Sequence, residues 1–197
     1  FVGTVTPRAV PVHETVLRAL SLVRRDYPSL AARLRLRFVG TSNQPDGSAY
    51  ALSDIVRAEG LADMVREEPV RVPFLDALRI VATSGANLLV GSIEPHYTAS
   101  KIYPGLMSGR PFLSVFHELS SAHAILARAG GGIALAFDGP GSLGALIPQI
   151  AQSFVRLAED PASLGQVDAA SYAPFTAAAI SERYGRIFDR LKAERQE

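Results

Sequence analysis

The sequence contains no cysteine and no tryptophan, and its charges nearly cancel. The absence of cysteine excludes a disulfide scaffold, a thiolate metal site and a cysteine nucleophile. A reducing cytoplasm is therefore the expected compartment. The 20 basic side chains face 19 acidic ones, so no excess of positive charge is available for a nucleic-acid partner. No apolar run approaches the ~18 residues of a membrane-spanning helix.

The composition that is present is that of an ordinary globular domain. Hydrophobic residues make up 48% and charged residues 20% of a chain of 197 residues, which excludes disorder and is enough to bury one large core. Residues 1–4, Phe-Val-Gly-Thr, have the pattern of a buried strand rather than of the start of a polypeptide. We therefore expect the chain to be a piece of a longer protein.

Short apolar segments alternate with helical segments along the chain. The segments predicted to be strands are residues 1–5, 34–39, 64–70, 87–91, 111–115 and 132–137. Most are apolar on both faces, which is typical of parallel strands covered by helices. The alternation predicts an α/β fold with a doubly wound, Rossmann-like, mostly parallel six-stranded sheet and helices on both faces. Residues 1–172 would form this domain, and residues 173–197 would add a C-terminal helix.

Ligands of such sheets bind at the carboxyl ends of the strands, and the segment 94–111 begins at one of these ends. Ser100 and Lys101 precede a helix there, and their hydroxyl and ammonium groups would suit a diphosphate. The alternative is that Ser100 only caps the helix and Lys101 is solvated. Pro104 suits a first helical turn, so the helix should start at or near it and end before Gly109.

Other chemical patterns are weaker. Residues 139–144 match the dinucleotide pattern G-x-G-x-x-G, but the second strand and acid that it requires about 20 residues on are missing. An NAD(P)-dependent oxidoreductase is therefore only the third alternative. His117 and His123 would lie about 120° apart on a helix, and His13 and His96 have no partner at ligand spacing. No metal is expected.

Basic side chains alternate along the second predicted strand, at Arg33, Arg35 and Arg37, after the pair Arg24 and Arg25. The favoured interpretation is a solvated edge of the sheet. The alternative is a basic rim that faces an anionic membrane, where each charge adds about 1 kcal/mol. The second interpretation would give the protein a membrane-peripheral location.

Residues 100–103, Ser-Lys-Ile-Tyr, followed by 106–111, Leu-Met-Ser-Gly-Arg-Pro, resemble the donor-site segment of GT-B-fold glycosyltransferases of the group 1 (family 4) class. The resemblance extends over nearly the whole chain. Further segments resemble strands and loops of the C-terminal domain of that family, at 1–4, 36–40, 60–74, 86–90 and 129–132. It implies a nucleotide-sugar-binding domain, an acceptor domain preceding Phe1, and a last helix that braces that other half.

The resemblance also implies a site. The diphosphate would be bound by residues of the opening glycine loop and of the segment after the fourth strand, namely Gly3, Thr4, Arg8, Ser100 and Lys101. The nucleoside and sugar would be bound by Thr41, Val72, Pro73, Glu94, His96 and Tyr103. Catalytic residues stay unassigned, and no cofactor is implied beyond the nucleoside-diphosphate sugar that serves as substrate.

The implied reaction is transfer of a sugar, with retention, to a glycan, lipid or small-molecule acceptor, as in bacterial carbohydrate biosynthesis. The isolated piece would be inactive because the acceptor site is missing. The two glutamates of the family fall at His96 and Pro104, and Glu94 lies two residues from the earlier position. A second hypothesis is therefore a non-catalytic relative that acts as a binding or scaffolding module.

Overall fold

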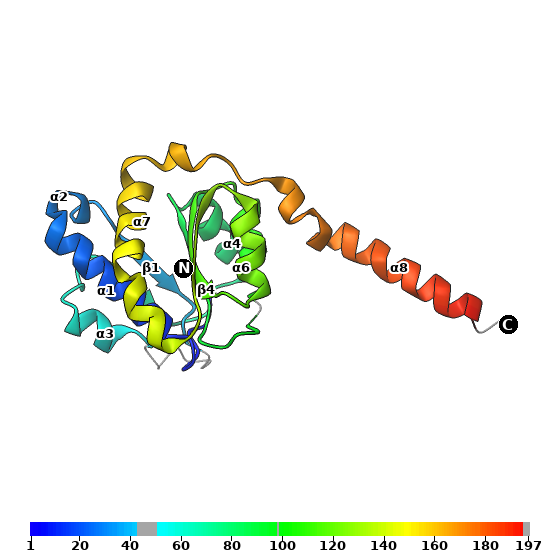
Figure 1. Ribbon diagram of the computed structural model, residues 1–197, viewed down its shortest axis with the longest axis horizontal. Coiled ribbons are helices and arrows are strands. Elements are labelled where there is room, and N and C mark those ends of the chain that lie inside the picture. Colours follow the sequence, from blue (N-terminus) through cyan, green and yellow to red (C-terminus); the bar gives the residue numbers. More distant parts are fainter. Residues whose placement is uncertain (43–50, 98, 195–197) are drawn as a thin grey trace.

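Strands and helices alternate along the chain in a computed structural model that describes residues 1–42, 51–97 and 99–194 (Figure 1). The strands are β1 (Leu36–Val39), β2 (Val65–Glu68), β3 (Asn87–Val90), β4 (Phe112–His117) and β5 (Gly132–Phe137). The helices are α1 (Val10–Asp26), α2 (Pro28–Ala31), α3 (Ser53–Ala58), α4 (Phe74–Thr83), α5 (Ile102–Met107), α6 (Ser121–Ala129), α7 (Ile147–Glu159) and α8 (Ala177–Glu194). The α/β class is confirmed.

The strands form two parallel sheets, so the prediction of one six-stranded sheet was wrong. β1 pairs with β2, while β3, β4 and β5 pair in that order. The first predicted strand, residues 1–5, is reduced to a parallel bridge between Val2 and Val39. Among the described strands, this segment forms main-chain hydrogen bonds only with β1. No pair of described strands therefore connects the two sheets.

Helices cover both faces of the strands, as predicted, and each face has its own core. β4 shows the alternation most clearly: Leu113 and Val115 pack with α1 and α7, while Phe112 and Phe116 pack with α5 and α6. Successive side chains of a strand point to opposite faces, so a strand that is apolar throughout can serve two cores. Removing these side chains from water is the main stabilising contribution to the fold.

α5 is the short helix predicted around Pro104. It begins at Ile102, which places Pro104 in the first turn, where the missing N–H of proline has no helical partner to lose. The helix ends at Met107, and Gly109 has φ +65°, a left-handed conformation that favours glycine. Lys101 is consequently fixed at the helix start.

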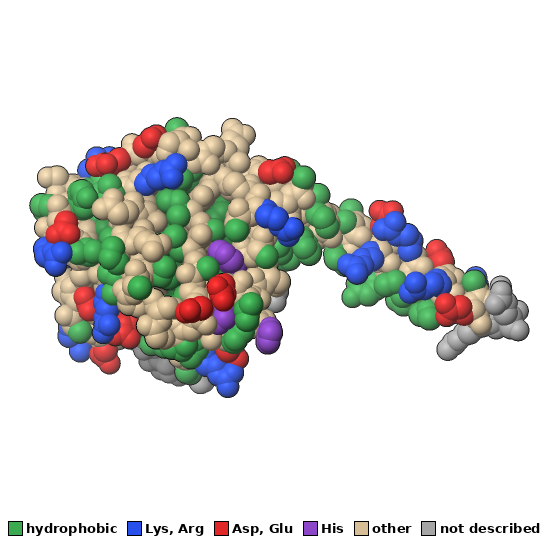
Figure 2. All heavy atoms as spheres, viewed as in Figure 1, with side chains coloured by type: hydrophobic (Ala, Val, Ile, Leu, Met, Phe, Trp, Pro, Cys, Tyr) green, Lys and Arg blue, Asp and Glu red, His purple; other side chains and the backbone are tan. Residues whose placement is uncertain are grey.

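α8 extends away from the rest of the molecule (Figure 1), and none of its residues is buried. Figure 2 shows its apolar side chains gathered along one side and its charged side chains on the other. Tyr184, Phe188 and Leu191 belong to this apolar stripe, and their exposed fractions are 57%, 64% and 49%. An exposed apolar stripe of this kind is typical of a surface that packs against another part of a protein.

No helix in the described part of the chain is long and apolar enough to cross a bilayer.

Candidate functional site

The loops at the carboxyl ends of β1 and β2 lie next to the opening segment, along one edge of the fold. The Val5 N–H donates to the Thr41 carbonyl at 2.9 Å, and the Ser42 N–H donates to the Pro69 carbonyl at 3.1 Å. These two main-chain bonds join three segments that are far apart in sequence. The carboxyl edge of parallel strands is where α/β folds bind ligands.

The loop after β3 is joined to the opening segment by two contacts. The Ile93 N–H donates to the Arg8 carbonyl at 3.0 Å, and the Arg8 guanidinium forms an ion pair with the Glu94 carboxylate. The Ser92 hydroxyl donates to the other Glu94 oxygen at 3.3 Å. The side chains of Arg8 and Glu94 are 68% and 40% exposed, so their pairing stabilises the fold only weakly and either partner is available to a ligand.

Lys101 lies directly against the glycine turn of the opening segment. Its Nζ is 4.6 Å from the centre of the Phe1 ring, and a Cβ added to Gly3 would lie 2.1 Å from it. Gly3 has φ +137°, a conformation that residues with side chains rarely adopt. Glycine is therefore required here both for the backbone turn and for the approach of the ammonium.

Burial lowers the pKa of Lys101 to about 8. None of the carboxylates in the described residues forms an ion pair with this ammonium, so the Phe1 ring is the contact that partly offsets its loss of water. A partly buried cation without a counter-ion is an arrangement that an anionic ligand would complete. The structure thus brings Gly3 and Lys101 together, with Arg8 and Glu94 at the neighbouring loop.

The Thr41 side chain is hydrogen-bonded to Glu67, a residue that the sequence analysis did not place in the site. The Thr41 hydroxyl donates to Glu67 Oε1 at 2.7 Å, and the N–H groups of Ala51 and Leu52 donate to the same carboxylate at 2.9 Å and 3.1 Å. Glu67 therefore holds the end of the loop after β1. Its position near the end of a predicted strand was a usable signal, but its partners are about 15 to 26 residues away in sequence, and spacing alone does not reveal them.

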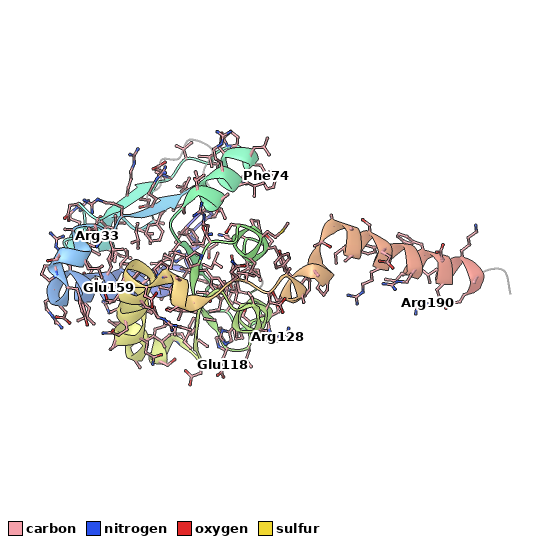
Figure 3. All side chains as sticks on the ribbon, turned by 90° about the horizontal axis from the view of Figure 1, so that it is seen from above. Arg33, Phe74, Glu118, Arg128, Glu159 and Arg190 are labelled. Atoms are coloured by element: carbon pink, nitrogen blue, oxygen red, sulfur yellow. The ribbon has the colours of Figure 1, made fainter. Side chains whose placement is uncertain are left out.

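Val72 and Pro73 follow β2 and lead into α4, where Pro73 is the residue before the helix. The first two helical residues, Phe74 and Leu75, are 72% and 73% exposed, and Figure 3 shows Phe74 at the start of the helix. These two exposed apolar side chains form a surface that suits contact with a planar aromatic ring of a ligand. The segment lies beside Thr41 at the carboxyl edge, because Arg71 packs within 3.9 Å of a Cβ placed on Gly40.

The structure gives less support to the other residues predicted for the donor site. Thr4 is half-buried in the opening segment, and His96 and Ser100 are exposed on the loop after β3. The Tyr103 ring packs against Phe175, with 5.2 Å between ring centres, and burial raises the pKa of its hydroxyl. Tyr103 therefore contacts the segment that leads into α8, and its expected role at the nucleoside remains a prediction.

An aromatic cluster that the sequence analysis did not anticipate lies beneath the opening segment. The His13 ring meets the Phe1 ring edge-on, with 4.8 Å between centres, and lies 5.9 Å from the Phe38 ring. His13 Nδ1 is 2.9 Å from the Ala9 carbonyl, whereas the buried Nε2 has no hydrogen-bond partner within the described structure. Burial is the main cause that lowers the pKa of His13 to about 4.

Replacing His13 by leucine is expected to remove part of the pH dependence of stability. Between pH 4 and 6.5 the unfolded chain binds a proton at His13 that the folded chain does not, so the free energy of unfolding rises with pH across this window. The full shift corresponds to about 3 kcal/mol. Urea unfolding of both proteins at pH 4.5 and pH 7 would measure it. An equal pH dependence in both would contradict the assignment, and His96→Leu, at an exposed histidine, is the control.

Two weaker patterns are explained by local structure. Residues 140–144 fall in a 3-10 helix, Pro140–Leu146, which Gly139 precedes and which leads into α7, and the described residues after α7 contain helices but no strand. The glycines therefore shape a tight turn. Arg24 pairs with Asp63 at 2.6 Å and Arg37 with Glu68 at 3.0 Å, as on a solvated edge. Within the described ranges, no three histidine or acidic side chains gather as a metal site would require.

No protein-family model and no curated protein sequence matches the chain. Similar solved structures include Anabaena HepE in complex with UDP-glucose, with a TM-score of 0.58 and 14% identity, and the same protein with UDP and glucose, at 0.56 and 12%. Sucrose-phosphate synthase from Thermosynechococcus elongatus matches at 0.56 and 13%. The matches cover 96% to 98% of this chain but 45% to 48% of those proteins. The chain thus spans about half their length and has the fold of that half.

Proposed function

We propose that this chain is the nucleotide-sugar-binding domain of a glycosyltransferase of the GT-B fold, group 1 (family 4) class. The observation that carries the proposal is the partly buried ammonium of Lys101 at the glycine turn of residue 3, at the carboxyl edge of the strands. The fold, shared with half of HepE and half of sucrose-phosphate synthase, supports it. HepE is a suitable guide to the ligand because it was solved with UDP-glucose.

The chemistry follows from where the charges lie. Departure of a nucleoside diphosphate from the sugar develops negative charge, and a fixed cation in a partly dry site lowers the barrier more than one in water. Lys101 would supply that cation, assisted by Thr4 and Ser100. Arg8 would exchange its weak pairing with Glu94 for a diphosphate oxygen, because a doubly charged anion is the stronger partner.

The other proposed contacts lie along the same edge. Val72 and Pro73 would flank the base beside Thr41, while Glu94 and His96 would face the sugar. Transfer with retention to a glycan, lipid or small-molecule acceptor would require a further domain, which the stripe on α8 would help to hold. Residues 1–197 alone would therefore bind a donor without transferring its sugar. A cytoplasmic, membrane-peripheral location fits this role.

Calorimetric titration with UDP, GDP, ADP and NAD would test the proposal. One of the three nucleoside diphosphates should bind measurably, and NAD should bind no more tightly than ADP. Binding to none of the diphosphates would overturn the proposal, and tightest binding of NAD would favour an oxidoreductase. Inorganic diphosphate should compete with the nucleotide, because both would occupy the position beside Lys101.

A second candidate is a non-catalytic relative that binds or scaffolds. It is favoured by one observation: Glu94, the carboxylate nearest the family positions, is held by Arg8 and Ser92, and the positions themselves are His96 and Pro104. No side chain at these two positions is therefore a carboxylate that could accept bonds from ribose hydroxyls.

This lack of carboxylates predicts weak discrimination between ribose and deoxyribose. UDP and 2′-deoxy-UDP, or the matching pair for another base, should bind within about threefold of each other, since a single hydrogen bond is worth about 0.5 to 1.5 kcal/mol and none is specified here. Calorimetry would compare the two affinities. A preference of more than tenfold for the ribose form, lost in Glu94→Gln, would show that Glu94 leaves Arg8 to bind the ribose, and the non-catalytic hypothesis would fall.

A further inference from the structure

The start of α4 carries the most exposed large apolar side chains in the described part of the chain. Phe74 and Leu75 are 72% and 73% exposed, and Val70, on the turn that leads into the helix, is 53% exposed. No residue of α4 is buried. We call Val70, Phe74 and Leu75 the apolar tip. Large apolar side chains grouped in this way on a surface mark a place of contact.

The segment that carries the apolar tip is rigid. Val70 follows the buried Pro69, whose carbonyl accepts a hydrogen bond from the Ser42 N–H at 3.1 Å. Pro73 immediately precedes α4, and its carbonyl accepts from the Ala77 N–H at 3.0 Å. Proline has a nearly fixed φ, so little backbone freedom remains to be lost when the tip binds a partner.

Arginines lie next to the apolar tip. Arg71 directly follows Val70 and is exposed. Arg79 lies four residues after Leu75, which places the two side chains on the same side of the helix, and the Arg79 side chain is 76% exposed. The tip is therefore bordered by positive charge on both sides along the chain.

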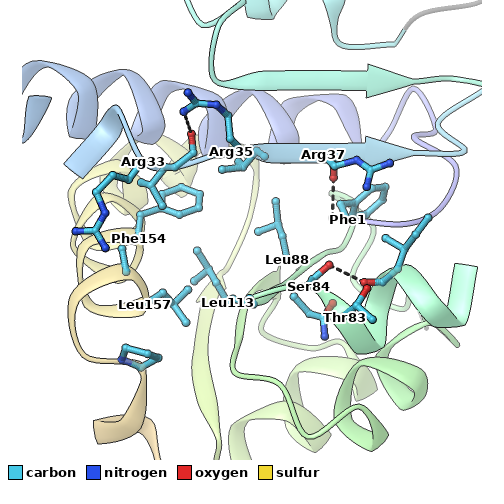
Figure 4. A pocket seen from close by; sticks show the side chains of 18 of the residues that line it. Phe1, Arg33, Arg35, Arg37, Thr83, Ser84, Leu88, Leu113, Phe154 and Leu157 are labelled. Atoms are coloured by element: carbon cyan, nitrogen blue, oxygen red, sulfur yellow. Dashed lines mark hydrogen bonds between the residues drawn. The ribbon is translucent and has the colours of Figure 1, made fainter. Parts of the chain in front are cut away.

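The adjoining face of the two-stranded sheet is basic as well. Arg37 and Arg66 pair in register across β1 and β2, so their side chains share a face of the sheet, where they are 52% and 76% exposed. Arg37 borders a cavity of about 630 Å³ together with Thr83 and Ser84 of α4 (Figure 4). This basic face and α4 are therefore neighbours.

The charges around the apolar tip favour an anionic partner. Glu68 is paired with Arg37 and Arg66, and Asp76 is paired with Arg79. Together with Arg71, four arginines thus accompany these two carboxylates, which leaves an excess of positive charge. The chain as a whole has a formal net charge of only +1, so positive charge is concentrated on this face.

We propose that the apolar tip enters the surface of an anionic lipid bilayer, with the four arginines at the level of the headgroups. Apolar side chains then leave water at the boundary of the acyl chains, and the long arginine side chains reach anionic headgroups. The carboxyl edge of β2 would face the bilayer. A lipid acceptor there would lie near the donor edge, a consequence that rests on the proposed function.

Two other occupants fit this surface less well. A planar base could stack on one tip side chain, but Phe74 and Leu75 leave the helix about 100° apart, so one ring does not cover both. A second copy of the chain in a two-fold contact would place the same arginines against one another, which is unfavourable. A lipid surface meets both the apolar and the charged requirements.

A tryptophan placed in the apolar tip would report its contact with lipid. The sequence contains no tryptophan, so Phe74→Trp adds a single fluorescent reporter. Its emission should shift to shorter wavelength with vesicles of phosphatidylcholine and phosphatidylglycerol in equal parts, and much less with phosphatidylcholine alone. Phe188→Trp is the matched control, because Phe188 is 64% exposed on α8. A shift in the control but not in Phe74→Trp would assign lipid contact to α8 and overturn the proposal.

Sedimentation with the same mixed vesicles would measure the affinity. Replacing both Phe74 and Leu75 by serine should weaken vesicle binding at least about tenfold, because two apolar side chains no longer leave water. Arg71→Gln should weaken it about fivefold, and added salt should act in the same direction. Leu119→Ser, at a side chain that is 64% exposed elsewhere, should change nothing. All of these side chains are exposed, so the variants should keep the fold.

No binding of the unaltered chain to the mixed vesicles would overturn the proposal, and so would equal binding by the double serine variant. A double variant that loses nucleotide affinity in solution and keeps its vesicle affinity would assign the tip to the ligand site instead, and the proposal would fall. Vesicle binding is measured without nucleotide. Its failure would therefore leave the proposed nucleotide site standing, and a failure of nucleotide binding would leave this surface standing.

Discussion

Replacing Lys101 by alanine is expected to weaken nucleoside-diphosphate binding about 10- to 150-fold, or about 1.5 to 3 kcal/mol. The effect is large because the ammonium is partly dehydrated beside Gly3, where its attraction to an anion is screened less than in water. Calorimetry at fixed ionic strength would measure it. Because burial lowers the pKa of Lys101 to about 8, the ammonium loses its proton as the pH rises above 8, and the nucleotide affinity of the wild-type protein should fall.

The chain offers a matched control for this experiment. Lys192 lies near the exposed end of α8, far along the chain from the proposed site, and Lys192→Ala should leave the affinity unchanged. Gly3→Ala should weaken binding as Lys101→Ala does, because the new Cβ would displace the ammonium from a strained turn. Combining the two substitutions should add little. Full affinity in Lys101→Ala would remove this residue from the site.

Replacing Phe116 by alanine is expected to destabilise the fold by about 3 to 5 kcal/mol, the range for a buried aromatic side chain. Phe116 is 1% exposed, and its ring lies so close to Gly91 that an added Cβ there would be 2.6 Å from it. The ring therefore supports the point at which β3 ends and the loop with Glu94 begins. Urea unfolding at pH 7 would give the loss, and nucleotide affinity should fall as well because the loop loses its support.

Leu119→Ala is the control for this second prediction. Leu119 follows β4 but is 64% exposed, so its loss should change the free energy of unfolding by less than about 0.5 kcal/mol. A loss below about 1 kcal/mol in Phe116→Ala would mean that the loop and the core around β4 rearrange to fill the space. The proposed link between this ring and the donor loop would then be wrong.

The strands with continuous apolar runs were the easiest to predict from the sequence. Residues 132–137 were predicted as they are observed in β5, because a short apolar run after two glycines is typical of a strand, even though Phe137 alone in it is fully buried. Pro104 located the start of α5 to within two residues, since proline fits few helical positions. Local chemistry of this kind acts over a few residues, and a sequence displays it directly.

Long-range pairing was not predictable in the same way. Residues 1–5 have the composition of a central strand, yet whether they join both sheets depends on what pairs with β3, which local composition does not specify. Arg8 and Glu94 were both predicted at the site, but their mutual ion pair spans 86 positions. The placement of Lys101 against Gly3 followed from the strand order of the fold rather than from either residue alone.

The helix α8 extends from the body of the molecule at one end only, so a rotation at its base displaces its far end. Its 18 residues span about 27 Å, so a rotation of about 10° at its base moves its tip by about 5 Å. The base is joined to the body by short 3-10 turns with side-chain caps at Asp160 and Asp168, and by the packing of Phe175 on Tyr103. Tyr103 is two residues from Lys101. A small rotation at the contact between Tyr103 and Phe175 would therefore produce a larger displacement at the far end of the helix.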